Sequence, residues 1–310
     1  MGDLVTDDVI IVTGASGAFG RAAASRLRER VPRGQLILAS RTPQKLADFA
    51  ARGAQVRFAD FDDPGSLRAA FAGGTKMLLI STARVGTRVS QHKNAIDAAA
   101  AAGVRHVAYT SVLSAARPDN PALVKLDHRA TEEYLERSGM SWTFLRDSQY
   151  AEAIALAMVP PALMAGRKPD NCGEGRVAFV SRDDCVACAS EVLLQPGHEN
   201  RAYDLTGPEL LTIGQALQMA AEIAGKPIVL EPVDDEGMFA YFDSLGVPRH
   251  ASDIVPAGPI PWSSDDMVTF GRAIREGFFA IQSDHVERIT GKKPTPLREI
   301  LLRHRAAWPA

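Results

Sequence analysis

The 310-residue chain has few cysteines, few aromatic residues and almost no net charge. Its three cysteines, an odd number, exclude a small fold built on a disulfide framework. A formal net charge of -2 gives no reason to expect nucleic acid or an anionic membrane as a partner. No apolar run approaches the roughly 20 residues that span a bilayer. What remains is an ordinary globular composition, with 46% hydrophobic and 23% charged residues, that can form a sizeable core.

The amino-terminal residues 1–8 are acidic and lack the basic-then-apolar pattern of a signal peptide. We therefore expect a cytoplasmic protein.

Two of the cysteines, Cys185 and Cys188, form a C-x-x-C motif. The segment from Asp183 to Leu194 is typical of a helix, and small buried cysteines on its core face explain the pair. A redox or metal role would need a second ligand pair or a preceding thioredoxin-like strand, and the sequence has neither. We expect no metal site.

Apolar runs alternate with helical segments through the first half of the chain. Continuous apolar runs are typical of strands buried on both faces, and this spacing requires helical crossovers. The pattern therefore predicts an α/β fold with a doubly wound parallel Rossmann sheet. Beyond Tyr150 it loosens into loop-like stretches, such as 256–262, with helices between them. The predicted strands are Val9–Thr13, Gln35–Ser40, Val56–Ala59, Met77–Ile80, His106–Thr110 and Trp142–Leu145, and the predicted helices between them are Gly20–Arg30, Pro43–Arg52, Pro64–Phe71, Val89–Ala102 and Lys125–Ser138.

Three glycines, at positions 14, 17 and 20, follow the first predicted strand and lead into the first helix. Gly14 permits a tight turn, Gly17 lets backbone amides approach a pyrophosphate, and Gly20 allows close packing of helix on strand. The helix N-terminus adds partial positive charge. This turn predicts dinucleotide binding, with Ser16, Ala18 and Phe19 as further contacts. The alternative is a glycine-rich turn without a ligand.

The end of the second strand indicates which dinucleotide binds. An NAD site places an acidic residue there, whereas an NADP site offers arginine to the 2′-phosphate. The sequence has Arg41, and its first carboxylate is Asp48. Arg41, helped by Lys45, therefore favours NADP(H); the alternative is an exposed loop arginine.

Five more candidate cofactor contacts follow the third, fourth and fifth strands. Asp60 is placed to contact the adenine edge or, equally, to cap a helix. The others are Phe61, Ser81, Thr82 and Thr110.

The segments Arg41-Thr42-Pro43, Gln91 to Ala99 and Ala102 to Ser111 resemble the NmrA-like branch of the atypical short-chain dehydrogenases/reductases. Within it the chain is most similar to the NADPH-dependent quinone oxidoreductase 2 type, and also to triphenylmethane reductases. The resemblance implies a Rossmann domain over residues 1–150 that binds NADP(H). Residues 151–310 would form mainly a substrate-binding lobe, from which some segments return to the Rossmann core.

The chain departs from the typical Tyr-x-x-x-Lys pair of short-chain dehydrogenases. If the segments align, His128 stands at the lysine position and Val124 at the tyrosine position, a pattern that the resemblance leads us to expect of the quinone oxidoreductase 2 type. After the sixth strand the family usually has Arg-Asn-Gly-x-Tyr, where this chain has Arg146-Asp147-Ser148-Gln149-Tyr150. The floor of the pocket, and with it the substrate, is therefore expected to differ.

A missing proton donor favours some acceptors over others. Hydride transfer to a ketone forms an alkoxide, whose conjugate acid has a pKa of about 16. Transfer to a quinone forms a phenolate with a pKa of roughly 10. The difference of about 6 units is worth on the order of 8 kcal/mol. We therefore predict an NADPH-dependent reductase of quinones or similar electron-poor aromatic acceptors.

Four residues are candidates for the catalytic site. His128 can donate to the nicotinamide ribose or to a developing oxyanion, or it is a solvated helix histidine. Lys125, one turn earlier on the same predicted helix, is the alternative to His128 for the cationic role. Ser111 stands where the family places its carbonyl-binding serine, or caps a turn. Tyr150 is the one phenol expected near the pocket, as a donor or as a packing residue. The second lobe offers apolar walls for an aromatic substrate: Met158, Val159, Met238, Phe239, Tyr241, Phe242 and Trp262.

Two other functions stay open. The altered Asp147 segment fits a reductase of an imine, an enone or another specialised metabolite, in which Asp147 anchors a cationic substrate. The loss of the catalytic pair fits a redox sensor of NmrA type that reads the NADP(H) state. A second copy of the chain, in a homodimer, is a further candidate partner.

Overall fold

The computed structural model describes residues 7–252 and 262–309. Strands and helices alternate through the first half, as the apolar runs predict. They are β1 (Ile10–Val12), α1 (Ala18–Arg28), β2 (Leu36–Ser40), the 3₁₀ helix η1 (Pro43–Leu46), α2 (Ala47–Ala50), β3 (Gln55–Phe58), α3 (Pro64–Phe71), β4 (Lys76–Leu79), α4 (Val89–Ala101), β5 (His106–Val112), α5 (Leu123–Glu136) and β6 (Ser141–Asp147).

Seven parallel strands form the main sheet, in the order β3-β2-β1-β4-β5-β6-β9. The strand order reverses between β1 and β4, and ligands of such sheets bind outside the carboxyl ends of the strands at that reversal. The predicted doubly wound Rossmann fold is confirmed. The glycine turn follows β1 and therefore lies at the reversal point.

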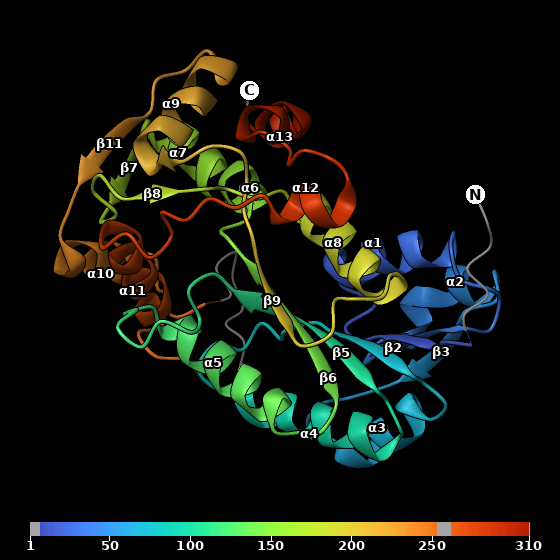
Figure 1. Ribbon diagram of the computed structural model, residues 1–310. Helices are drawn as coiled ribbons and strands as arrows, with labels where there is room; N and C mark the ends of the chain where they lie inside the picture. The colour runs from blue at the N-terminus through green and yellow to red at the C-terminus, as the bar shows by residue number, and fades with distance from the viewer. Residues whose placement is uncertain (1–6, 253–261, 310) are drawn as a thin grey trace.

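Helices cover both faces of this sheet (Figure 1). Along β1, Ile10 and Val12 pack with α1 and α8, whereas Ile11 packs with α3 and α4 on the other face. Both faces of the strand are thus buried, which explains why the strands consist of continuous apolar runs rather than of alternating polar and apolar residues.

The second half of the chain adds a smaller helical region and two short sheets. Its elements are α6 (Ala151–Ala153), the π-helical turn η2 (Ile154–Met158), α7 (Val159–Ala165), β7 (Arg167–Asp170), β8 (Arg176–Val177), α8 (Arg182–Leu194), β9 (Arg201–Leu205), β10 (Leu211–Thr212), α9 (Ile213–Ala224), β11 (Val229–Pro232), α10 (Asp235–Ser244), α11 (Ser264–Arg275), α12 (His285–Thr290), α13 (Leu297–His304) and the 3₁₀ helix η3 (Arg305–Ala307).

Three elements of the second half join the Rossmann core. Strand β9 pairs with β6, α8 packs against α1, and α12 packs against α8 and β9, all within one core on one face of the sheet. The C-x-x-C cysteines, Cys185 and Cys188, lie fully buried in α8 within that core. Burial on a core face therefore accounts for them. A separate apolar core holds α7, α9, α13 and the end of α11 together.

The sequence placed most elements to within a few residues. Strand β6 is longer than Trp142–Leu145 and reaches Asp147, which puts that carboxyl at the end of the strand. The predicted Pro43–Arg52 helix is a 3₁₀ turn followed by one short helix. The loop-like stretch 256–262 lies, except for Trp262, outside the described residues.

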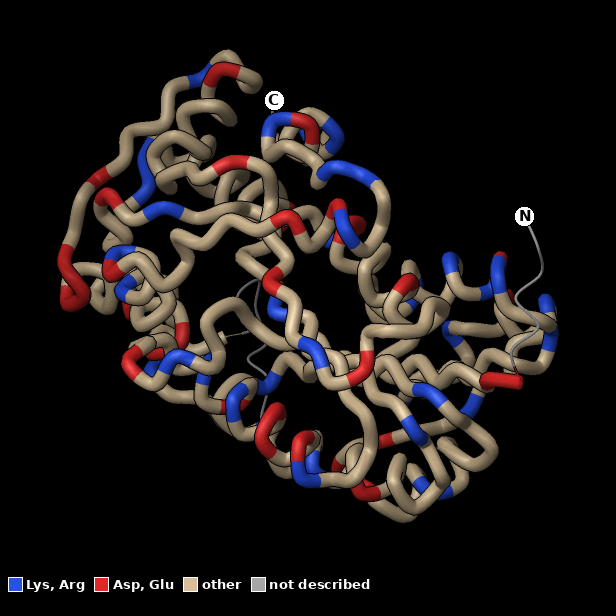
Figure 2. The backbone as a smooth tube through the Cα atoms, in the orientation of Figure 1, with Lys and Arg blue, Asp and Glu red and all other residues tan. Residues whose placement is uncertain are grey.

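Lys and Arg are interspersed with Asp and Glu along the described backbone (Figure 2). Within the described residues, no helix is long and apolar enough to cross a membrane.

Candidate functional site

The turn between β1 and α1 brings its first and last glycines together. Gly14 has a φ of +57°, in the left-handed region that favours glycine. A Cβ on Gly20 would lie 2.5 Å from the Gly14 carbonyl oxygen and 2.8 Å from the Ala15 Cα. Only glycine lets α1 start this close to the turn.

The N-terminus of α1 has no internal partner for its first amides. Gly17 is the N-cap residue and has no side chain, and the first turn carries no acidic residue. The amides of Ala18 and Phe19, which belong to the positive end of the helix dipole, therefore have no side-chain cap. Such a terminus is built to receive an anion, and the turn fits a pyrophosphate.

Hydroxyl groups tie this turn to the end of β2. Ser40 Oγ donates to Ser16 Oγ at 2.7 Å, and Thr42 Oγ1 donates to the same oxygen at 3.0 Å. Arg41 and Lys45 extend into solvent beside these hydroxyls. Among the described residues, neither cation has a carboxylate partner. The end of β2 thus presents two free positive charges next to the glycine turn.

The loop between β3 and α3 shows which aspartate caps the helix. Asp63, and not Asp60, caps α3, because its Oδ1 accepts from the Gly65 amide at 3.0 Å. Asp60 is half-buried and its Oδ1 accepts from the Asp62 amide at 3.1 Å, which shapes the turn. The Phe61 side chain is buried in the core between α3, α4 and the sheet.

Ser81 and Thr82 follow β4 and connect to the neighbouring elements. The Ser81 amide donates to Thr110 Oγ1 on β5 at 2.9 Å, and Thr110 donates to Ser81 Oγ at 3.3 Å. Thr82 Oγ1 donates to Gln91 on α4 at 2.8 Å. These three candidates therefore lie together at the carboxyl edge of the sheet.

Ser111, at the end of β5, is part of a buried ion-pair cluster. Its hydroxyl donates to Glu132 Oε1 on α5 at 2.7 Å. Arg146 of β6 binds the same carboxylate through two nitrogens, at 2.9 and 2.8 Å. Glu132 is fully buried, and these three bonds compensate for its lost hydration. The hydrogen of the Ser111 hydroxyl is thus already engaged within the protein.

His128 lies on the face of α5 that packs on the sheet, and is not a solvated helix residue: its side chain is 5% exposed. Its Nδ1 is 2.9 Å from the Tyr109 hydroxyl of β5. Burial, together with Arg88 and His92 nearby, holds the pKa of His128 well below its usual range. His128 is therefore neutral at physiological pH. Its Nε2 has no hydrogen-bond partner among the described residues.

Lys125 and Tyr150 each donate to a protein acceptor. Lys125 is buried, not exposed, and its Nζ donates to the Pro118 carbonyl at 3.1 Å. Tyr150 Oη donates to Asp147 Oδ2 at 2.5 Å. Burial raises the pKa of Asp147 to about 7, against the lowering effect of the Tyr150 bond. A carboxyl that is 5% exposed and bound to a tyrosine is poorly suited to anchor a cationic substrate.

Sequence reasoning missed the residues around His128. Tyr109 is a second phenol beside the candidate site, so Tyr150 is not alone there. A fully buried tyrosine in an apolar strand usually needs a hydrogen-bond partner, which was the available signal. Arg88, at the start of α4, is 4% exposed, and its Nε lies 3.2 Å from Asp127 Oδ2. No periodicity of the sequence indicates that ion pair.

Part of the expected apolar wall lies in hydrophobic cores. Val159, Met238 and Phe242 are buried among apolar neighbours and line no open surface. Trp262 is 38% exposed. The composition of the second half thus reflects its own packing as much as a substrate pocket.

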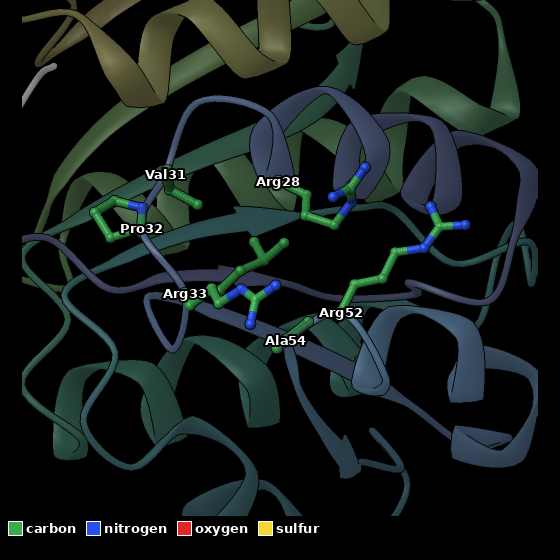
Figure 3. A pocket seen from close by; sticks show the side chains of 8 residues that line it. Arg28, Val31, Pro32, Arg33, Arg52 and Ala54 are labelled. Carbon is green, nitrogen blue, oxygen red and sulfur yellow. The ribbon is translucent and has the colours of Figure 1, made fainter.

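A small cavity of about 180 Å³ lies away from all of these residues (Figure 3). It is lined by Arg28 and Val31 near the end of α1, by Arg33, and by Arg52 and Ala54 before β3. These residues lie at the amino ends of β2 and β3, opposite the glycine turn. Arg33 and Arg52 are exposed, so water solvates their charges.

Known proteins resemble this chain over most of its length. A family model described as NAD(P)H-binding matches residues 14–193. Quinone oxidoreductase 2 of Escherichia coli is 35% identical over 270 residues, which cover 86% of this chain and 93% of that protein. The crystal structure of the E. coli NADPH-dependent quinone oxidoreductase with NADPH has 33% identity and a TM-score of 0.85, covering 95% of this chain and 99% of that one. The Citrobacter sp. triphenylmethane reductase with NADP(H) has 31% identity and a TM-score of 0.82, with the same coverage.

Proposed function

The chain belongs to the NAD(P)H-binding NmrA-like family, and from that premise we propose that it is an NADPH-dependent reductase of quinones or similar electron-poor aromatic acceptors. The observation that carries the proposal is the buried His128, bonded to Tyr109 of β5, and it is supported by Val124, which the resemblance puts at the tyrosine position. The similar E. coli and Citrobacter proteins, a quinone oxidoreductase and a triphenylmethane reductase, support the acceptor class.

The residues around the glycine turn fit NADP(H). The uncapped α1 terminus and the close approach at Gly20 leave backbone amides for the pyrophosphate. Arg41 and Lys45 provide the positive charge that a 2′-phosphate requires. Ser16, held by two hydroxyl bonds, lies between the turn and these cations.

Further contacts are proposed along the carboxyl edge. Asp60 and Phe61 flank the adenine side, and Ser81, Thr82 and Thr110 flank the nicotinamide side. When bound, NADPH supplies the hydride that reduces the acceptor.

The protein contributes orientation and a hydrogen-bond donor. Reduction of a quinone by a hydride and a proton gives a hydroquinone, whose anion is a weak base with a conjugate pKa of roughly 10. Such an anion needs stabilisation but no strong acid at the moment of transfer. His128 Nε2 is the donor without a protein partner, and we assign it this role. Ser111, Lys125 and Tyr150 are weaker candidates, since each already donates to a protein acceptor.

The remaining parts of the proposal concern the rest of the molecule. Residues 151–310 form mainly the substrate-binding lobe, and residues 1–150 the NADP(H)-binding domain. We propose the cytoplasm as the compartment, because the three cysteines are free and buried. A homodimer stays open and is decided by light scattering of the purified protein.

The test is NADPH oxidation by the purified protein with quinones, triphenylmethane dyes and simple ketones, with NADH in parallel. We expect rapid turnover with quinones or dyes, none with ketones, and a preference for NADPH. Tight NADPH binding without turnover of any acceptor would reject the reductase and favour a redox sensor. Fast reduction of an imine or an enone, without reduction of quinones, would move the assignment to that acceptor class.

A further inference from the structure

His128 and two buried side chains behind it form one hydrogen-bonded set. His92 comes from α4, Tyr109 from the central strand β5 and His128 from α5. Tyr109 Oη lies 2.9 Å from His128 Nδ1 and 3.5 Å from His92 Nδ1. His92 and Tyr109 are fully buried, so the polar hydrogens of these two side chains need protein partners. Their bonds therefore determine which nitrogen of each ring carries its proton.

The proton of His92 is placed by its own partners. The Thr82 amide donates to His92 Nε2 at 3.2 Å, so Nε2 carries no hydrogen. A neutral imidazole has one N–H group, which must then be on Nδ1. His92 Nδ1 lies 2.8 Å from Thr131 Oγ1, whose own hydrogen goes to the Asp127 carbonyl at 2.8 Å. Thr131 is thus ready to accept, and the assignment is consistent at both ends.

His92 then limits what Tyr109 can do. Because His92 Nδ1 carries a hydrogen aimed at Thr131, it cannot accept from the phenol. Among the described residues, the Tyr109 hydroxyl then has two acceptors in reach, His128 Nδ1 at 2.9 Å and Thr131, whose oxygen already accepts from His92. The reverse direction, from His128 to Tyr109, would leave the buried phenol hydrogen only Thr131 Oγ1, which it would share with the N–H group of His92, a weaker arrangement.

We propose that Tyr109 and His92 are positioning residues that hold His128 as its Nε2–H tautomer, so that this N–H is directed at the reacting acceptor. The inference rests on the role proposed above for His128. The hydrogen-bonded set connects Thr82, a candidate cofactor contact, through His92 and Tyr109 to His128, the proposed donor. Sequence comparison with a Tyr-x-x-x-Lys pattern does not reveal it, because Tyr109 lies on the strand and not on the helix.

Burial, with the charged groups around the set, keeps its histidines from titrating near neutral pH. Arg88 from α4 lies beside both histidines, and Asp127 on α5 is paired with Arg88. Burial lowers the pKa of His92 to about 3 and, with Arg88 and His92, also lowers that of His128. Neither ring gains a second proton near neutral pH, so the single N–H of each ring stays where its partners place it.

The test is the ¹⁵N spectrum of protein labelled at histidine, which distinguishes protonated from unprotonated ring nitrogens without any substrate. Signals are assigned with His128→Gln and His92→Gln. In the unmodified protein we expect His128 protonated on Nε2 and His92 on Nδ1. A His128 signal protonated on Nδ1 would overturn the proposal, whether or not the protein reduces quinones.

A matched pair of variants tests the role of the phenol. Tyr109→Phe removes the bond to His128, whereas Tyr134→Phe removes an exposed phenol bond from the same α5 region to Asp97. We expect Tyr109→Phe to mix the two His128 tautomers and to lower kcat 3- to 10-fold, with the KM for NADPH within 2-fold, and Tyr134→Phe to change neither. A His128 spectrum unchanged in Tyr109→Phe would overturn the positioning role. The spectrum of the unmodified protein decides the tautomer if Tyr109→Phe does not fold.

Discussion

Replacement of Arg41 by alanine should separate the two nicotinamide cofactors. Arg41 is exposed, has no carboxylate partner among the described residues and stands beside the turn that fits the pyrophosphate. A pair of unit charges at 4 Å is worth about 1 kcal/mol in bulk water and about 4 kcal/mol at an effective dielectric constant of 20. A phosphate monoester carries about 1.5 to 2 negative charges.

Because Arg41 is exposed, we expect a loss near the lower end, about 2 kcal/mol. This corresponds to roughly 30-fold weaker NADPH binding at about 1.4 kcal/mol per tenfold. NADH lacks the 2′-phosphate, so its affinity should change less than about 2-fold. The assay is a fluorescence titration of each cofactor into the free protein.

Arg33→Ala is the matched control. Arg33 is also an exposed arginine, but it lies at the opposite end of the sheet (Figure 3). Its replacement removes the same charge and should leave both affinities unchanged. An equal loss for NADPH and NADH in Arg41→Ala, or an equal loss in Arg33→Ala, would refute the assignment of the 2′-phosphate site.

Three further substitutions test other parts of the structure. Gly20→Ala places a Cβ 2.5 Å from a carbonyl oxygen, and we expect about 1 to 3 kcal/mol lower stability in denaturant unfolding, with weaker NADPH binding. Glu132→Gln leaves the half-buried Arg146 and the buried Ser111 without their carboxylate and should cost about 3 to 5 kcal/mol, whereas Glu133→Gln, in an exposed pair on the same helix, should cost less than about 1 kcal/mol. Asp147→Asn removes a carboxyl whose pKa burial raises from 3.8 to about 7. Because the folded state binds this proton more tightly than the unfolded chain does, the protonated carboxyl stabilises the fold fully below about pH 4. This stabilisation is lost as the pH rises through about 7. The unfolding free energy of the unmodified protein should therefore fall more steeply between pH 4 and 8 than that of the variant, by up to about 4 kcal/mol.

Each of these has a contradicting outcome. Unchanged NADPH affinity and stability in Gly20→Ala would mean that the turn tolerates a side chain. Similar losses of unfolding free energy in Glu132→Gln and Glu133→Gln would mean that the buried Glu132 cluster does not stabilise the fold. Parallel pH curves for Asp147→Asn and the unmodified protein would place the pKa of Asp147 near its ordinary value.

The alternation of strands and helices was predictable from the sequence because strands buried on both faces consist of continuous apolar runs. The runs Ile10–Val12 and Leu36–Ala39 have no polar position, so they predict central parallel strands. Gly14 and Gly20 were predictable for a related reason, since a positive φ and a backbone contact at 2.5 Å leave no alternative to glycine.

The environment of the candidate donor was not predictable in the same way. The burial of His128, and the phenol that faces it, depend on how α4 and α5 pack against β5, which local sequence patterns do not encode. Asp147 was noted as a departure from the family, but the end of β6 and the bond to Tyr150 explain why its charge is not free. Apolar residues such as Val159 are equally suited to a pocket wall and to a core, and the sequence alone does not separate the two.

The most direct test of a reductase without a strong acid is the rate of hydride transfer from NADPH to a quinone in a single turnover. NADPH deuterated at the transferred position is mixed with the protein and a benzoquinone in a stopped-flow instrument. We predict fast NADPH oxidation, slowed by deuterium, and no oxidation when a simple ketone replaces the quinone. NADPH that binds but is not oxidised by the quinone, or a ketone reduced as fast as the quinone, would contradict this mechanism.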